Sequence, residues 1–287
     1  MKEHSSVFPV KKMAETLEIS RSGYYAWKNL KPSKRYQEEL KLLIEIKTIH
    51  EKSRETYGVL RITVELNNQG TPCSKNRVAR IMKKYHIKAK TKKKFRITTH
   101  SNHNKPVSED LVKRDFTASA KNELWTSDIT YIWTREGWLY LAVILDVFLR
   151  KVVGWALKST LSAELVVEAL QKAICKEKPA PGMIFHSDQG IQYASDKVRK
   201  ILKFHGLQQS MSRKGNCYDN AITESFFHTF KTEFIYFEDF ETKEEAQLKV
   251  FDFIETFYNR ERLHSALGYL SPLVFEQLSE KQEGTAA

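Results

Sequence analysis

The stretch LWTSDITYIWTREGWLYLAVILDVFLRKVVGWALK, residues 124–158, decides the fold. Aromatic and β-branched residues dominate it and Gly137 marks a turn, so it predicts three neighbouring strands. Asp128 lies inside the first of these apolar runs. A charge in an otherwise apolar strand needs a physical reason, because burying it is costly. Asp128 is therefore a candidate functional residue.

The residues that follow predict alternating helices and strands. SAELVVEALQKAI, residues 162–174, carries a continuous apolar stripe at helical spacing. A short strand, MIF, then leads to His186, Ser187 and Asp188, and a helix over about 195–205, a strand near 207–211 and a helix bearing Glu224 complete the series. Three adjacent strands followed by this alternation predict an α/β fold of the RNase H-like type.

The first 30 residues predict two short helices at helix-turn-helix spacing, with Arg21 and Ser22 opening the second. A plain helical hairpin fits this pattern equally well. The residues expected on the shared apolar side are Met13, Ala14, Leu17, Ile19 and Tyr24.

A second helical unit is predicted downstream. It begins with a helix over about 36–51 and ends with a pair of helices, of which the second has Ser74 as its N-cap and Val78, Ile81 and Met82 facing inward. Its outward side would carry a set suited to phosphates and base edges, although a solvated basic face is the alternative reading. That set is Lys75, Asn76, Arg77, Arg80, Lys83 and Lys84.

The run KAKTKKKFR, residues 88–96, is densely basic and has no periodicity. It predicts a flexible arm that follows a phosphate backbone, with Lys92, Lys93 and Lys94 at its centre. The resulting division is a helix-turn-helix-like unit at 1–33, a second such unit with its basic arm at 34–96, a linker at 97–116, a catalytic core at 117–240 and a C-terminal helical extension at 241–287.

The overall composition limits the class of protein. The formal charge of +12 and the 41% hydrophobic content of the 287 residues fit a globular protein with a polyanionic partner, nucleic acid first and an anionic membrane second. No apolar run is long enough to span a bilayer, so we expect no membrane association and a cytoplasmic location, at the nucleoid when DNA is bound. Three widely spaced cysteines without a Cys-x-x-Cys pair argue against disulfides and a structural zinc site.

Three acidic residues occupy settings that suit metal binding: Asp128 in WTSDITYIW, Asp188 in FHSDQGIQY and Glu224 in DNAITESFFHTFKTE. Each alone would more often be an ordinary turn or surface residue. Two magnesium ions about 4 Å apart can activate a nucleophile and stabilise a leaving oxygen, and they need carboxylates from rigid, converging elements. We assign Asp128 and Asp188 to both metals or the first, and Glu224 to the second. Lys231 follows Glu224 by seven residues, two turns along the same helix face.

Five strings spread over the chain carry a family resemblance. They resemble the B-frame (OrfB) transposases of bacterial insertion sequences of the IS-three type, which are DDE recombinases related to retroviral integrases. The strings are LWTSDITYI, YLAVILDVFLRKVVGWAL, HSDQGIQY, SMSRKGNCYDNAITESFFHTFKTE and YNRERLHSALGYLSPLVFE.

The resemblance implies 3′-end DNA cleavage and strand transfer that depend on magnesium, with manganese as a substitute. By motif position, Asp128, Asp188 and Glu224 correspond to the catalytic triad, and Lys231 to a basic residue that contacts terminal DNA. Asp146 is also typical of the family, but a structural role is favoured for it; Arg262 and His264 could pack or touch DNA. The implied active-site surroundings are His186, Gln189, Gly190, Tyr193, Gly215, Asn216 and Asn220.

The resemblance also implies partners: double-stranded DNA of element ends and target, the upstream-frame OrfA-type protein or a fusion to it, and further copies of the chain on DNA. The chain lacks the His/His/Cys/Cys zinc unit of the retroviral enzymes and the upstream-frame segment. Two alternatives stay open: a DNA-binding regulatory or accessory subunit that is inactive without that fusion, and a ribonuclease of the same fold.

Overall fold

The strands predicted from residues 124–158 form the centre of a mixed sheet. The computed structural model describes residues 1–91, 107–113, 115–212 and 221–286. Strand β1 (Leu124–Thr134) pairs antiparallel with β2 (Gly137–Asp146), which pairs antiparallel with β3 (Val152–Lys158). On its other side β1 pairs in parallel with β4 (Ile184–Ser187), and β4 pairs in parallel with β5 (Gln208–Met211), giving the order β3-β2-β1-β4-β5.

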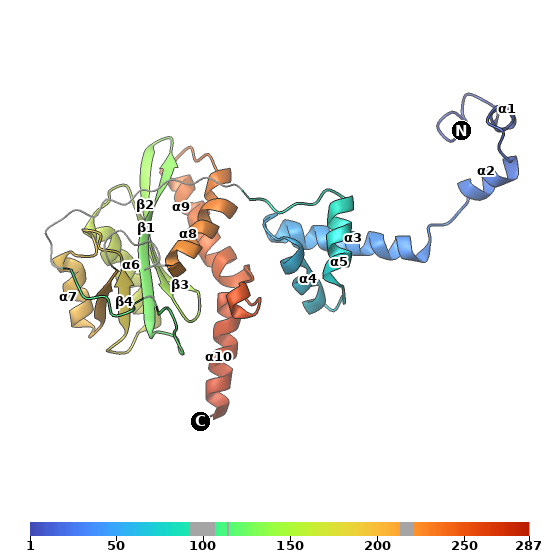
Figure 1. Ribbon diagram of the computed structural model, residues 1–287. Helices are drawn as coiled ribbons and strands as arrows, with labels where there is room; N and C mark the ends of the chain where they lie inside the picture. The colour runs from blue at the N-terminus through green and yellow to red at the C-terminus, as the bar shows by residue number, and fades with distance from the viewer. Residues whose placement is uncertain (92–106, 114, 213–220, 287) are drawn as a thin grey trace.

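One face of the sheet is covered by α6 (Ala163–Glu177) and α7 (Asp196–Phe204), as Figure 1 shows. The predicted apolar stripe of α6 is fully buried against β2 and β3. Gly154 on β3 permits this close approach, because a Cβ there would lie 2.5 Å from the carbonyl oxygen of Ala169. The helix therefore fits the sheet only with glycine at this position.

The opposite face is covered by a layer rich in phenylalanine. Helix α8 (Ala221–Glu233), the turn η2 (Ile235–Phe237), helix α9 (Lys243–Phe251) and the π-helix η3 (Asp252–Glu261) bury their apolar sides against β2 and β3. The largest side chains of this cluster include Phe226, Phe227, Phe230, Phe234, Phe253 and Phe257. Helices on both faces of this mixed five-stranded sheet confirm the predicted RNase H-like, integrase-type core.

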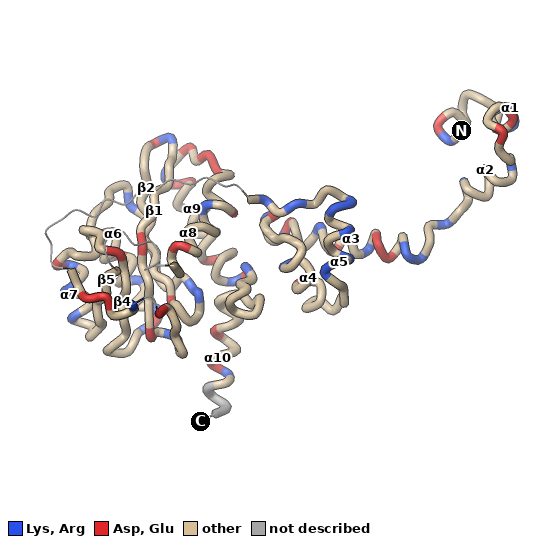
Figure 2. Tube along the Cα trace, in the orientation of Figure 1, with Lys and Arg blue, Asp and Glu red and all other residues tan. Residues whose placement is uncertain are grey.

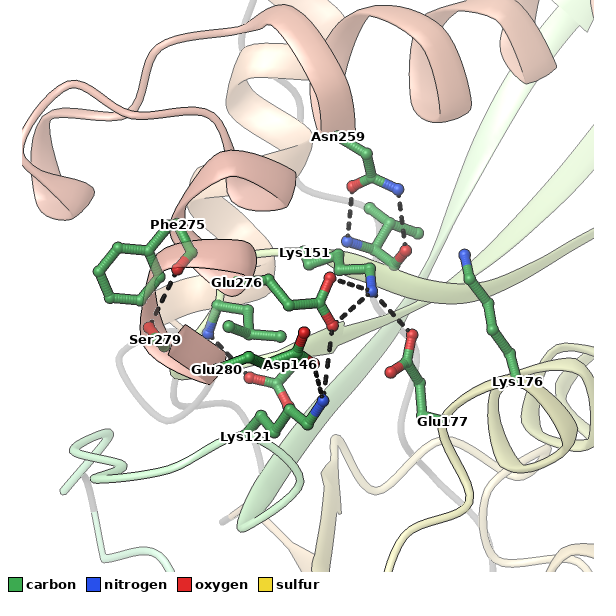
Figure 3. Close-up of polar contacts among 12 residues, drawn as sticks. Lys121, Asp146, Lys151, Lys176, Glu177, Asn259, Phe275, Glu276, Ser279 and Glu280 are labelled. Carbon is green, nitrogen blue, oxygen red and sulfur yellow. Dashed lines mark hydrogen bonds and ion pairs between the residues drawn. The ribbon is translucent and has the colours of Figure 1, made fainter. Parts of the chain in front are cut away.

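The last helix, α10 (Pro272–Ala286), is tied to the sheet by a buried ion-pair network (Figure 3). Lys151, 7% exposed, contacts Glu276 of α10 at 2.7 Å and Glu177 of α6 at 3.0 Å. The Asn259 side chain of η3 exchanges two hydrogen bonds of 3.0 Å with the backbone of Val152, the first residue of β3. These contacts join the C-terminal segment to the exposed edge of the sheet.

The two N-terminal helices are α1 (Val10–Thr16) and α2 (Arg21–Lys28), with Ser20 as the N-cap of α2. Ala14 and Tyr24 are buried, whereas Leu17 and Ile19 of the same predicted apolar side are 57% and 46% exposed. The physical reason is size: two helices of seven and eight residues cannot enclose five apolar side chains.

The second helical unit consists of α3 (Lys34–Lys52), α4 (Val59–Asn68) and α5 (Lys75–Lys84). Ser74 accepts a hydrogen bond from the Arg77 amide, which confirms the predicted N-cap, and Val78, Ile81 and Met82 are buried. Lys and Arg occur repeatedly along α5 and again at residues 88 and 90 after it (Figure 2). The core of this unit also includes Leu263 from the C-terminal segment, so the unit packs against that segment.

Residues 108–112, within the segment predicted as a linker, run along the edge of the sheet. The Leu111 amide donates to Ser210 Oγ of β5 at 2.9 Å, and Val112 is buried. Among the described residues, Cys73 and Cys175 are free thiols, and no helix is long and apolar enough to cross a membrane.

Candidate active site

Asp128 and Asp188 are brought side by side by the parallel pairing of β1 and β4. The last two register pairs are Thr126 with His186 and Ser127 with Ser187, so the two aspartates occupy the next matched positions. Asp128 also pairs with Val143 of β2, whose side chain lies in the phenylalanine-rich cluster. Cross-strand neighbours share a face, so both carboxylates lie on the side of the sheet that α8 covers.

Burial and the neighbouring Asp188 both raise the pKa of Asp128. Loss of solvent contact and the negative charge of Asp188 raise the pKa of Asp128 to about 8, and Glu224 adds to this shift. The Ile129 amide, 2.7 Å from the Asp128 carboxylate, and the Lys231 ammonium oppose it. The pair of carboxylates is thus a site where negative charge is concentrated and unfavourable.

Helix α8 carries the other two predicted residues. Thr223 is buried and donates a hydrogen bond of 2.8 Å to Thr126 of β1, which fixes the start of α8 against the strand that bears Asp128. Glu224 follows directly and is exposed, and partial loss of solvent raises its pKa. Lys231 is half-buried; desolvation lowers its pKa and the charge of Asp128 opposes this.

The loop after β4 folds over Asp188. The Gly190 amide donates to Asp188 Oδ1 at 2.9 Å, and a Cβ on Gly190 would approach the same oxygen to 2.9 Å. A side chain at position 190 would therefore push the Asp188 carboxylate out of its present position. Gln189 lies between these two residues and is partly buried.

Tyr193 and His186 are buried and contact the strands next to the carboxylates. The Tyr193 hydroxyl hydrogen-bonds Ser127 Oγ at 2.9 Å, and desolvation together with Asp128 and Asp188 raises its pKa well above the usual value. His186 Nδ1 hydrogen-bonds Ser210 Oγ at 2.9 Å, which links β4 to β5. Both residues support the strands that position the aspartates.

Asp146 accepts hydrogen bonds from the backbone amides of Asn122, at 2.7 Å, and Leu149, at 2.8 Å. It is fully buried, so its carboxylate serves the structural role expected for it.

Several predicted residues lie outside the described residues: Lys92, Lys93, Lys94, Gly215, Asn216 and Asn220. Within the described ranges, no three His, Cys, Asp or Glu side chains gather closely enough to hold a metal ion. Asp128, Asp188 and Glu224 therefore interact electrostatically without forming a closed set of ligands.

The predicted DNA-contacting side of α5 is exposed at Lys75, Asn76, Arg80 and Lys83. Arg77 and Lys84 are instead paired with carboxylates of α3, at 3.6 Å to Glu38 and 2.5 Å to Glu39. Two of the six predicted side chains, those of Arg77 and Lys84, thus form ion pairs within the helical unit.

The sequence did not reveal the residues that hold α8 in place. Besides the Thr126–Thr223 pair, Arg262 forms a buried bidentate contact with Glu233 at 2.7 and 2.8 Å. His264 is also largely buried, and its pKa falls to about 3 through desolvation and the charges of Arg262 and Arg61. Of the two readings for Arg262 and His264, packing is the one that the structure supports.

Comparison with protein families places this geometry in a known class. An integrase core domain model matches residues 118–217, a second integrase core domain model matches 205–272, and an HTH-like domain model matches 37–95. Together with the sheet and the paired aspartates, these matches define an integrase-core protein with an N-terminal helix-turn-helix-like domain.

Similarity to curated proteins extends over nearly the whole chain. The chain is 41% identical over 278 residues to "Transposase InsF for insertion sequence IS3A" of Escherichia coli (strain K12), covering 96% of each chain. It is 44% identical over 265 residues, 92% of this chain and 97% of the other, to "Insertion element IS600 uncharacterized 31 kDa protein" of Shigella sonnei. The chain belongs to the IS3-family transposases of the InsF type, as the resemblance indicated, and its function is transposition.

Solved structures give more distant matches. The catalytic core domain of BIV integrase is 18% identical, with a TM-score of 0.42, covering 56% of this chain and 98% of that chain. The HTLV-2 integrase catalytic core domain in complex with magnesium is 13% identical, with a TM-score of 0.43, covering 55% of this chain and 99% of that chain.

Proposed function

We propose that the chain performs metal-dependent 3′-end cleavage and strand transfer on the DNA of its element, with Asp128, Asp188 and Glu224 as catalytic metal ligands. The observation that carries this proposal is the register of β1 and β4, which sets two carboxylates side by side and raises the pKa of Asp128 to about 8. A site that concentrates unfavourable negative charge in this way is suited to a divalent cation.

The residues present fit such a cation. Carboxylate oxygens are the ligands that magnesium prefers, and manganese accepts them as well. Two carboxylates on adjacent strands form the rigid part of the site, and Glu224 is near enough to act on Asp128 electrostatically. We infer that Glu224 approaches the aspartates when the metal binds, and that the complete site holds two ions.

Two bound magnesium ions would supply an activated oxygen nucleophile and stabilisation of the leaving oxygen. The chain's own residues prepare that site. The Ile129 amide and Gly190 amide orient the carboxylates through hydrogen bonds of 2.7 and 2.9 Å. Lys231, half-buried beside Asp128, would place a cation against the phosphate of the terminal DNA strand.

Direct assay of cleavage and joining tests this function. Purified protein should nick and join duplex carrying the element's terminal repeats when magnesium or manganese is present, and EDTA should abolish both reactions until excess magnesium restores them. The products are resolved on denaturing gels. Equal activity in EDTA would refute the metal-dependent mechanism. A preference for RNA:DNA hybrid over duplex DNA would favour the ribonuclease alternative.

The exposed basic side of α5 supports duplex DNA as the substrate. Lys75, Arg80 and Lys83 form no ion pair with the described residues, so their charges are available to phosphates. The basic run that follows α5 adds to this charge, with Lys92, Lys93 and Lys94 at its centre.

Binding to DNA should depend steeply on salt. Affinity for a labelled duplex, measured by fluorescence anisotropy, should fall by about 10³-fold between about 50 and 200 mM salt, as expected for six or more phosphate contacts. A flat dependence on salt would contradict a phosphate-following basic unit.

We propose that the active form includes further copies of the chain and the upstream-frame protein. The metal-ligand set is not closed among the described residues, and apolar side chains are exposed on and just after the short N-terminal helices, such as Trp27 at 58% and Leu30 at 76%. Both observations favour a chain that works in an assembly. The same observations favour the accessory-subunit alternative, which predicts that the isolated chain binds terminal DNA without cleaving it.

A further inference from the structure

An open cleft lies between the second helical unit and the C-terminal segment. It has a volume of about 420 Å³ and is lined by the start of α4, by Lys75 at the start of α5, and by Ser265 and Tyr269 of the C-terminal segment. Arg61 of α4 forms part of its wall. Two elements that are about 200 residues apart in the sequence thus build one concave surface.

The chemistry of the lining points to an anion. None of the lining residues is acidic, whereas Arg61 and Lys75 bring positive charge, and Ser265 and Tyr269 bring hydroxyl groups that can donate hydrogen bonds. A second cleft of 220 Å³ differs in this respect, because the acidic residues Glu233, Glu238 and Asp252 are part of its lining. That acidic lining makes the second cleft less suited to an anion.

The C-terminal wall is held firmly. His264 N–H donates to Leu270 O at 3.0 Å and Tyr269 N–H donates to His264 O at 2.8 Å, which closes the turn that carries Ser265 and Tyr269. Tyr269 has a φ of 62°, a conformation that non-glycine residues adopt only where the surroundings enforce it. The Tyr57 hydroxyl, which accepts from the Leu263 amide at 2.7 Å, fastens this segment to the helical unit.

Arg61 connects the cleft to the catalytic helix. One of its terminal nitrogens lies 3.7 Å from Glu233 at the end of α8, and Glu233 is held on its other side by Arg262. A ligand in the cleft would therefore contact an arginine that also touches the helix bearing Glu224 and Lys231.

We propose that this cleft is a binding site for one backbone phosphate of duplex DNA, with Lys75 and Arg61 as its cations and Ser265 and Tyr269 as hydrogen-bond donors. The inference rests on the proposed function, since it assigns a specific contact to the DNA that the chain processes. It makes the C-terminal segment part of the DNA-binding surface, and it fixes the phosphate at a set position relative to α8.

The test compares Lys75→Gln and Tyr269→Phe with the wild-type chain and with Lys47→Gln, an exposed lysine on α3 outside the cleft. Binding to a labelled terminal-repeat duplex and to a scrambled duplex is measured over a salt series. Lys75→Gln should weaken binding to the two duplexes equally, by about three- to tenfold, and it should reduce the slope of log affinity against log salt concentration by about one. Lys47→Gln should change neither quantity.

Single methylphosphonate substitutions along the duplex locate the contact. At one position the neutral linkage should weaken binding of the wild-type chain and Lys47→Gln clearly more than binding of Lys75→Gln or Tyr269→Phe, because these two variants have already lost part of the contact with that phosphate. If every position weakens all four proteins alike, the cleft does not hold a phosphate. If the wild-type chain binds no duplex at all, the proposed function fails instead.

Discussion

Replacing Asp188 by asparagine should reduce cleavage and strand transfer by more than about a thousandfold, a loss of about 4 kcal/mol of transition-state stabilisation. Asparagine keeps an oxygen that can accept the Gly190 amide, so the turn over the site should persist. It removes the negative charge that faces Asp128, and with it one ligand that a divalent ion needs. Single-turnover gel assays of nicking and joining measure the effect.

The same substitution separates catalysis from folding. Without metal, Asp188→Asn should be at least as stable as the wild-type chain, because the repulsion that raises the pKa of Asp128 is relieved. The stabilisation that magnesium gives the wild-type chain in thermal unfolding should disappear. Asp196→Asn, at the exposed start of α7, is the matched control. It should leave the stability without metal and the stabilisation by magnesium unchanged. Substantial activity in Asp188→Asn would remove Asp188 from the catalytic set.

Local patterns were sufficient to predict the sheet and the position of Asp128. Residues 124–158 are rich in aromatic and β-branched residues, which indicates three paired strands, and the register of the first two follows from the short turn at Gly137. The N-cap at Ser74 and the inward face of α5 were also predictable, because capping and helical periodicity depend on residues only a few positions apart.

Contacts between distant segments could not be predicted in this way. Nothing in the sequence near Arg262 indicates that it pairs with Glu233, or that Leu263 completes the core of a unit that begins more than 200 residues earlier. The exposure of Leu17 and Ile19 was missed because helical spacing identifies an apolar face without showing whether anything is present to cover it. Tertiary packing decides such cases.

Lys151 gives the largest expected effect on stability. Its ammonium lies between Glu276 and Glu177, and although burial disfavours its charge, the hydrogen bonds that it donates to these two carboxylates raise its pKa. Lys151→Met would leave the buried Glu177 carboxylate without its cation and Glu276 with only the Lys121 ammonium, 4.0 Å away (Figure 3). We expect a loss of about 3–5 kcal/mol in the free energy of unfolding, measured by urea denaturation, and release of α10 detected by proteolysis near its start.

A triple variant tests whether the lost stability comes from unpaired charge or from packing. Neutralising the carboxylates as well, in Lys151→Met with Glu177→Gln and Glu276→Gln, should recover most of the stability, since a neutral site of similar volume carries no uncompensated charge. Lys172→Met, which breaks the exposed pair with Glu168 on the same helix as Glu177, should cost less than about 0.5 kcal/mol. If Lys151→Met proved as mild as Lys172→Met, the buried network could not be what holds α10 against the sheet.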